Sequence, residues 1–270
     1  MNRFLNPLNS SFWGGLAIAA IATGLGFGTA APAWAGYGFI TIGNDEGGFW
    51  QCEGNFQGNS GNGLCVRRDE VNPGEPYKYY RGDVQNGTFS GRGKLVYEND
   101  DRYEGQMRNG RPNGFGTFIS VEENRRYTGT FKNGEFHGRG AYTFANGSKY
   151  VGEFAGSQPH GLGVFTAYED GKPDRPLYTY TGRFYLGTIN GNGVVVSADN
   201  VRCAGVFYSN TLSGRGVCTY PQGSEFKRYD GEIRNGRPNG RGVMTYSDGR
   251  KPYAGEFREG RPGLPKTPNS

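Results

Sequence analysis

A short motif recurs along most of the chain. In its clearest copy it reads Tyr103-Glu104-Gly105-Gln106-Met107, then Asn109-Gly110, then Gly114-Phe115-Gly116-Thr117-Phe118. Eight full copies and a final half-copy begin at positions 52, 80, 103, 127, 150, 180, 203, 229 and 253, with Cys in place of Tyr at 52 and 203. A repeat this short cannot bury a core alone, so the fold must be a stack of small, similar units.

Each copy has the pattern of a β-hairpin. Large side chains and glycines alternate with period two on both sides of an Asn-Gly turn, as expected for two paired strands. Antiparallel pairing with Gly105 opposite Gly116 places Tyr103 opposite Phe118 and Met107 opposite Gly114. Glycine normally weakens a strand. Paired glycines at the same depth of every hairpin, however, allow bending and let aromatic rings lie over bare backbone.

The composition excludes several classes of protein. The 270 residues include 49 Gly and 14 Pro but are only 34% hydrophobic, which disfavours a helical bundle or a doubly wound α/β enzyme. Aromatic residues reach 14%, which disfavours simple disorder. With two His and four Cys, the chain is a poor candidate for a Cys/His-rich zinc protein or a histidine-based active site. We therefore expect no enzyme activity, metal or cofactor.

The repeat resembles the MORN (membrane occupation and recognition nexus) repeat over residues 52–260. This resemblance implies an all-β fold, an elongated, twisted single antiparallel sheet of stacked β-hairpins. Residues 36–51 would form an N-terminal cap segment, and residues 261–270 a disordered tail. The two long spacings between copies hold Pro- and charge-rich insertions around Glu70–Pro76 and Glu169–Pro176, which are expected to be loops.

The first 35 residues have the pattern of a secretory signal peptide. Arg3 is their only charge, an apolar run follows from about Leu16 to Phe27, and Ala33-Trp34-Ala35 forms an A-x-A cleavage site. The alternative is an uncleaved anchor, but the glycine-interrupted run is shorter than the roughly 20 residues that a span needs. Cleavage would leave Gly36 first and lower the formal charge from +5 to +4. The sequence thus predicts an exported bacterial protein, periplasmic or extracellular.

The four cysteines occupy matched positions in two copies. Cys203 and Cys218 fall where Tyr103 and Phe118 lie, and Cys52 and Cys65 are the equivalent pair in the first copy. Directly opposed strand residues lie within disulfide range, whereas crossed pairings would bridge copies six repeats apart. The predicted disulfides are Cys52–Cys65 and Cys203–Cys218, which fits an exported protein. The alternative is four reduced thiols that act as small apolar residues.

Charged residues recur at two fixed positions of the repeat. Carboxylates follow the glycine of the first strand, at Asp83, Glu153, Glu232 and Glu256. Arginines stand between the two glycines of the Gly-x-Gly in the second strand, at Arg92, Arg139, Arg215 and Arg241. The hairpin register places Arg92 opposite Asp83, and Arg241 opposite Glu232. The other two arginines face uncharged residues. One interpretation is weak cross-strand ion pairs on a solvated face. The other makes the four arginines candidate sites for an anionic ligand.

Other motifs carry less chemistry. His137 and His160 both precede the first glycine of a Gly-x-Gly, a turn position that is Asn or Ser in other copies, so a shared metal has no evident third ligand. The Gly-x-Gly strings lack the Lys-Ser/Thr and the helix that a phosphate loop requires.

Three functions remain open, and the first is favoured. It is a non-enzymatic protein-interaction scaffold, because repeat arrays offer extended surfaces to protein partners. The second is a membrane-surface module that binds anionic lipid head groups, although no dense basic cluster occurs. The third is an envelope-polysaccharide binder or hydrolase that uses exposed Tyr and Trp50 with a carboxylate pair. Nucleic acid is not an expected partner. The exposed edges of an open stack also permit an end-to-end homodimer.

Overall fold

The computed structural model describes residues 36–43, 49–67, 77–169 and 172–263. The predicted signal peptide (1–35) and the predicted loop at Glu70–Pro76 lie outside these ranges. Every regular element within them is a β-strand, and they contain no helix long and apolar enough to cross a membrane. The chain divides into an N-terminal unit, up to Ala145, and a C-terminal unit, from Asn146.

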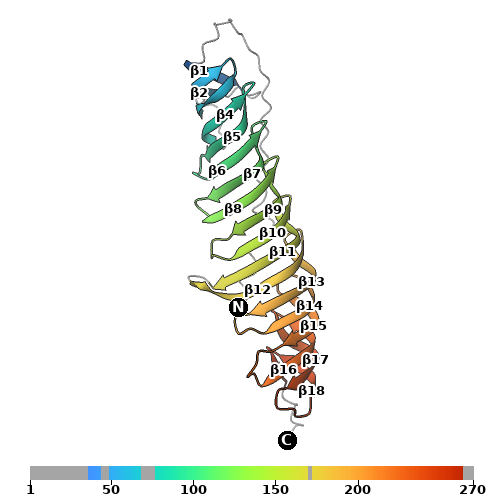
Figure 1. Ribbon diagram of the computed structural model, residues 1–270. Coiled ribbons are helices and arrows are strands. Elements are labelled where there is room, and N and C mark those ends of the chain that lie inside the picture. The colour runs from blue at the N-terminus through green and yellow to red at the C-terminus, as the bar shows by residue number, and fades with distance from the viewer. Residues whose placement is uncertain (1–35, 44–48, 68–76, 170–171, 264–270) are drawn as a thin grey trace. The chain divides into compact units, whose positions relative to one another are not determined.

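The N-terminal unit is a run of strands in which each one pairs antiparallel with the next along the chain (Figure 1). These strands are β1 (Gly36–Gly43), β2 (Phe49–Gln57), β3 (Ser60–Arg67), β4 (Tyr77–Gln85), β5 (Thr88–Tyr97), β6 (Arg102–Arg108), β7 (Arg111–Ser120), β8 (Arg125–Lys132) and β9 (Glu135–Thr143).

The C-terminal unit follows the same antiparallel order. Its strands are β10 (Lys149–Ala155), β11 (Gln158–Glu169), β12 (Lys172–Tyr185), β13 (Thr188–Ser197), β14 (Arg202–Tyr208), β15 (Ser213–Thr219), β16 (Phe226–Arg234), β17 (Arg237–Tyr246), β18 (Tyr253–Arg258) and β19 (Arg261–Pro262). The predicted all-β fold of stacked antiparallel hairpins is thereby confirmed.

In the hairpins that begin with a tyrosine, a glycine pair lies at the centre, under the tyrosine ring. In β6–β7 Gly105 pairs with Gly116, and Tyr103 pairs with Phe118, as predicted. The Tyr103 side chain is fully buried. A Cβ atom added to Gly116 would lie 2.5 Å from the Tyr103 hydroxyl oxygen and 2.6 Å from its ring. Glycine is therefore required here by the close approach of the ring to the backbone.

The register near the turn differs from the prediction. Met107 pairs with Pro112, not with Gly114, because Asn109 and Gly110 both have positive φ and close a two-residue turn. Between the pair Gly105–Gly116 and the pair Met107–Pro112, β7 contains two more residues than β6. These extra residues form a bulge in β7 that includes Gly114, at φ 101°. The same shift occurs in β4–β5, β6–β7, β8–β9, β10–β11, β12–β13 and β16–β17.

The tyrosine hydroxyl binds a backbone carbonyl at this bulge. Tyr103 donates a hydrogen bond of 2.7 Å to the carbonyl oxygen of Gln106, the residue that the bulge removes from the ladder. Each tyrosine at this position donates in the same way to the carbonyl three residues later; the donors are Tyr80, Tyr103, Tyr127, Tyr150, Tyr180, Tyr229 and Tyr253. The hydroxyl thus satisfies a polar group that the bulge would otherwise leave without a partner.

Aromatic rings join neighbouring hairpins within each unit. The Tyr103 ring meets Phe131 of the following hairpin edge to face, with centroids 4.9 Å apart, and Tyr150 meets Phe184 at the same distance. These contacts form the core. Trp50 belongs to it as well, being 6% exposed with its ring 5.1 Å from Phe89. The expectation that Trp50 could stack on a sugar at the surface is wrong, because the ring is packed inside the stack.

The hairpins with cysteines are built differently. Cys52 and Cys65 lie opposite each other in β2–β3, with sulfurs 2.07 Å apart, and Cys203 and Cys218 do so in β14–β15, at 2.03 Å. These are the pairs that the register predicts. Neither hairpin contains the register shift of the tyrosine hairpins. Without a tyrosine there is no hydroxyl to satisfy the carbonyl of a bulge.

One predicted loop is mostly strand. β11 continues to Glu169 and β12 begins at Lys172, so most of Glu169–Pro176 extends this hairpin beyond its neighbours. Two further register shifts, next to Tyr168, accommodate the proline-rich sequence. At the other end, the first two residues of the segment predicted as a disordered tail form β19, and residues beyond 263 lie outside the described ranges.

Replacing Tyr103 with Phe should lower the free energy of unfolding by about 1–3 kcal/mol, because the Gln106 carbonyl loses its partner while the ring remains. Urea denaturation of the full chain measures the change. Tyr208→Phe is the matched control, since Tyr208 is 59% exposed, and should stay within about 0.5 kcal/mol of the wild type. Equal effects of the two substitutions would contradict the role of the hydroxyl.

Alkaline pH should unfold the protein. Burial raises the pKa of the stacked tyrosines, that of Tyr229 to about 12. The unfolded chain ionises at the ordinary value of 10.0, so the stabilisation present below pH 10 is lost as the pH rises toward 12. Circular dichroism and phenolate absorbance should change together over this range. Ionisation of all 18 tyrosines near pH 10 with unchanged circular dichroism would contradict this view.

Candidate functional site

The sheet face opposite the tyrosines, here the open face, carries most of the exposed side chains. Along the C-terminal unit its central row joins residues that lie opposite one another on successive strands: Val151, Val164, Thr181, Val194, Ala204, Val217, Asp230, Val243 and Ala254. The same row of the N-terminal unit reads Glu53, Leu64, Arg81, Lys94, Glu104, Thr117, Thr128 and Ala141. Valine is the commonest residue of the row in the C-terminal unit, whereas four residues of the row in the N-terminal unit are charged: Glu53, Arg81, Lys94 and Glu104.

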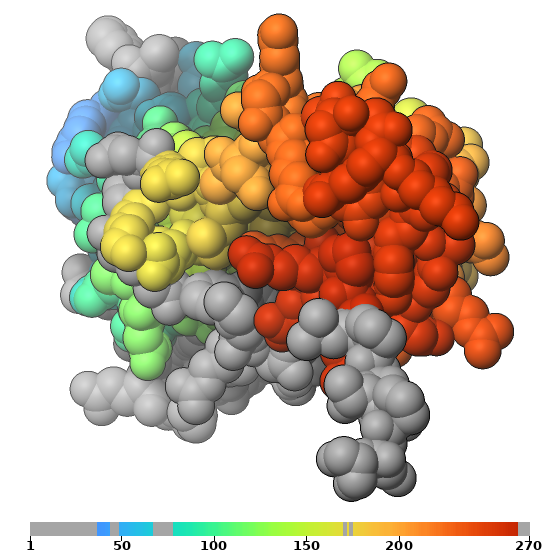
Figure 2. Space-filling model, turned by 90° about the horizontal axis from the view of Figure 1, so that it is seen from below, coloured from blue at the N-terminus to red at the C-terminus, as the bar shows by residue number. Residues whose placement is uncertain are grey.

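Several aliphatic side chains on this face of the C-terminal unit are open to solvent. Val151 is 56% exposed and Val243 43%, and the neighbouring positions Leu162 and Val206 reach 57% and 50%. Single exposed aliphatic residues are ordinary, but a row that crosses successive strands is a contiguous patch. Figure 2 views this unit from its C-terminal end, where side chains project from the orange and red surface.

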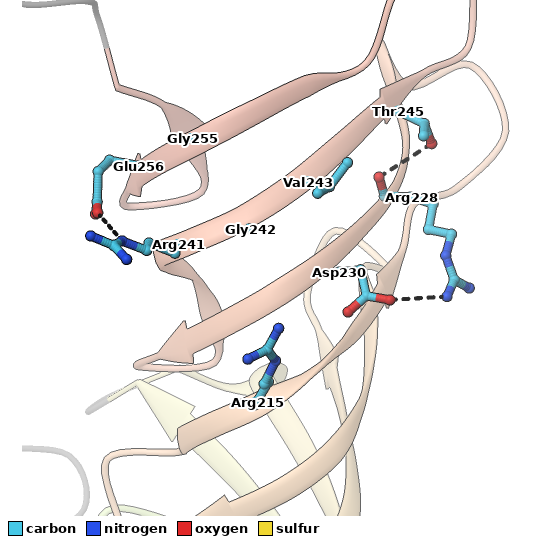
Figure 3. A pocket seen from close by; sticks show the side chains of 9 residues that line it. All are labelled: Arg215, Arg228, Asp230, Arg241, Gly242, Val243, Thr245, Gly255 and Glu256. Carbon is cyan, nitrogen blue, oxygen red and sulfur yellow. Dashed lines mark hydrogen bonds and ion pairs between the residues drawn. The ribbon is translucent and has the colours of Figure 1, made fainter.

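A hollow of about 880 Å³ lies on the open face between β15 and β18 (Figure 3). Three arginines line it beside Val243. Two of them form ion pairs: Arg228 with Asp230 at 3.5 Å, and Arg241 with Glu256 at 3.3 Å. Arg215 extends from β15 toward the same hollow and forms no ion pair with a described residue. Its guanidinium is the cation that remains available to a ligand here.

The predicted pairing of Arg241 with Glu232 is wrong. Arg241 lies opposite Glu256 of the next hairpin, while the bulge in β16–β17 takes Glu232 out of the ladder toward β17. The Glu232 carboxylate lies over Gly240, where an added Cβ would be 2.4 Å from its Oε2 atom. Because this carboxylate covers the bulge, it does not pair with Arg215, which faces it across β15–β16.

A second hollow, of about 630 Å³, lies on the open face of the N-terminal unit. Arg81, Arg92 and Lys94 line it with Glu104, and none of the three cations forms an ion pair with a described residue. The predicted Arg92–Asp83 ion pair is wrong. Asp83 accepts a hydrogen bond of 2.8 Å from the backbone amide of Arg92, so its carboxylate caps the bulge and leaves the guanidinium free.

The remaining predicted residues do not join these hollows. Arg139 is exposed on β9 of the N-terminal unit. His137 lies opposite Thr130 in the N-terminal unit, and His160 lies opposite Glu153 in the C-terminal unit. Among residues 36–43, 49–67, 77–169 and 172–263, no three His, Cys, Asp or Glu side chains are grouped as metal ligands.

Sequence reasoning identified only part of each hollow. Arg92, Arg215 and Arg241 were singled out by their place between the paired glycines, but Arg81, Lys94 and Arg228 were missed. All three alternate with the repeat's Tyr and Gly positions, as open-face residues must. Reading those alternate positions copy by copy would have revealed them, and the valine row as well.

Comparison with protein families shows where this fold belongs. The model of the MORN repeat matches residues 80–102, 103–125, 127–149, 150–172, 180–202, 203–225 and 229–249. These seven matches cover more than half of the chain, so the protein belongs to the MORN repeat family, whose members are generally protein- or membrane-interaction modules. The hairpin at β2–β3 and the half-copy from Tyr253 lie outside the matches.

A comparison with curated proteins found no match. Among solved structures, the chain is similar to the TCP domain of SAS-4 (dCPAP) from Drosophila melanogaster, solved in complex with a proline-rich motif of Ana2 (dSTIL). The two are 15% identical, the likeness covers 74% of this chain and 95% of that one, and the TM-score is 0.31.

Proposed function

We propose that the protein is an exported, non-enzymatic interaction scaffold, and that the open face of its C-terminal unit binds an acidic, partly apolar segment of another protein. The observation that carries this is the hollow in which Arg215, free of ion pairs, lies beside the exposed Val243. Arginine beside apolar surface, rimmed by polar groups, is the composition of protein interfaces. A carboxylate of the partner would pair with Arg215 while its aliphatic groups cover the valine row.

Export is supported by two features of the sequence and structure. The two disulfide pairs suggest an oxidising compartment. The predicted cleavage after Ala35 would leave Gly36 at the amino terminus, which is the first residue of β1. A mature chain that begins there keeps every described strand.

The intact mass of the protein recovered from its native cell envelope or medium tests this directly. We expect the mass of residues 36–270 less four hydrogens, because the two disulfides remove four thiol hydrogens. Reduction should add those four hydrogens back. A mass that includes residues 1–35, or one that reduction leaves unchanged, would contradict export through a cleaved signal or the oxidised state.

Anionic lipid head groups are the second candidate ligand. The observation in their favour is the N-terminal hollow, where Arg81, Arg92 and Lys94 stand together without ion pairs. Arg81 lies directly opposite Lys94, an arrangement of like charges that an anion would stabilise. A head-group ligand would not explain the exposed valine row of the C-terminal unit, because head groups offer charge and not apolar surface.

A photo-crosslinking residue at Val243 of the full chain, in the cells that make it, should yield an adduct with one discrete protein. Arg215→Glu in the same chain should abolish most of that adduct, because the guanidinium that pairs with the partner is reversed in charge. The matched control is the crosslinker at Val121, which is similarly exposed (48%) but lies outside both hollows.

The same adduct at Val121, or no protein adduct at Val243, would contradict the scaffold proposal. Co-sedimentation with vesicles then distinguishes the lipid alternative. Binding to anionic but not zwitterionic vesicles, lost at high salt and in an Arg92→Glu variant, would replace a protein partner with head groups.

A further inference from the structure

The strand at the amino-terminal end of the stack is unlike the others. β1 has the sequence Gly-Tyr-Gly-Phe-Ile-Thr-Ile-Gly, with no charge and no proline. It lies at the end of the N-terminal unit (Figure 1), and of the described residues only those of β2 pair with it. A long, uncharged edge strand is the feature that most readily pairs with another strand.

The disulfide in the neighbouring hairpin fixes which amides β1 presents. Cys52 and Cys65 have Cα atoms 3.9 Å apart, the close spacing of a pair that exchanges no backbone hydrogen bonds. The amide and carbonyl of Cys52 therefore point the other way, toward its β1 partner Ile40. Since these directions alternate along a strand, Ile40 is bonded to β2, and Phe39 presents its amide and carbonyl at the free edge. Tyr37 and Thr41 do so as well.

The side chains of these outward-bonding residues are also exposed. Tyr37 is 71% exposed and Phe39 66%, the two highest values among the exposed large hydrophobic residues. Ile42, on the other face, is buried at 8%. Unpaired backbone groups and exposed aromatic rings thus occur at the same residues, and one added strand would satisfy the first and place its own side chains beside the second.

The carboxyl-terminal end of the stack shows how such an edge is otherwise protected. There β18 ends at Arg258, and the last described strand is the two-residue β19, which pairs with it through Pro262 and Arg261. A proline cannot donate to a further strand, and charged, short edge strands resist pairing. β1 has none of these protections.

We propose that β1 is the strand through which two copies of this chain pair, antiparallel and edge to edge. An uncharged strand offers nothing to a charged partner but pairs with itself without repulsion. Pairing about a two-fold axis at Phe39 places Phe39 opposite its counterpart and Tyr37 opposite Thr41. Side chains that point to the same face of the sheet then lie opposite one another in the two copies, whereas a shift of one residue would place them on opposite faces. The arrangement is isologous and uses up the edge, so assembly stops at two copies.

Charge exchange at Phe39 tests this. The full chain should have the mass of a dimer by light scattering, and Phe39→Lys and Phe39→Glu should each be monomeric, because two like charges would lie opposite each other. Mixing the two variants should restore a dimer that contains one of each. This rescue separates loss of pairing from loss of folding, which unchanged circular dichroism of the variants also checks.

Phe115→Lys is the matched control, since Phe115 is 61% exposed but lies on β7, between paired strands. It should remain a dimer. A monomeric wild-type chain, dimers that persist in both Phe39 variants, or dissociation by Phe115→Lys would each overturn the proposal. So would the absence of a dimer from the mixture of the two variants.

Discussion

The contact between a tyrosine ring and a pair of glycines determines the rest of the structure. The ring of Tyr103 lies so close to the backbone at Gly105 and Gly116 that no side chain fits beneath it. Its hydroxyl reaches past the glycines to the carbonyl that the bulge frees, while its ring edge packs on Phe131 of the following hairpin. One side chain thereby fixes the bend of its own hairpin and joins it to the next. A single layer of sheet can then bury rings without a second layer, although aliphatic residues are few.

The two cysteine hairpins support this account, because where cysteine replaces the tyrosine, the tyrosine ring over the glycines and the register shift are both absent. Where Cys203 replaces the tyrosine, no ring covers Gly205, and an added Cβ there would meet the backbone of the opposite strand. The strands run straight past the glycines with no register shift, and a covalent bond joins the two positions that Tyr and Phe occupy elsewhere. The glycine pair is kept in both designs, so close approach of the two strands is needed with or without a ring.

The sequence was enough to predict the hairpins, the glycine pairs and the cysteine pairs, because each of these follows from a period of two counted from one fixed contact. It was not enough to place Asp83 or Glu232. Counting outward from Asn109-Gly110 puts Met107 opposite Pro112, whereas counting from the glycine pair puts it opposite Gly114. Both counts are correct locally, and the chain satisfies both with a bulge. The carboxylates fall beside that bulge and form no ion pair with the arginines predicted to face them; Asp83 accepts a hydrogen bond from the amide of Arg92, and the Glu232 carboxylate lies over Gly240.

The residues that form the fold and the residues that are available to bind a ligand lie on opposite faces of the strands. The tyrosines, glycine pairs and stacked phenylalanines that form the fold occupy one face of each strand, so the alternate positions on the open face are free to differ between repeats. They do differ: Arg81 and Lys94 in one unit occupy the row where the other unit has Val194 and Val243. The capped bulges also matter here, because Asp83 accepts a hydrogen bond from the backbone amide of Arg92 and forms no ion pair with that guanidinium. The unpaired guanidinium of Arg92 is therefore a consequence of how its hairpin folds.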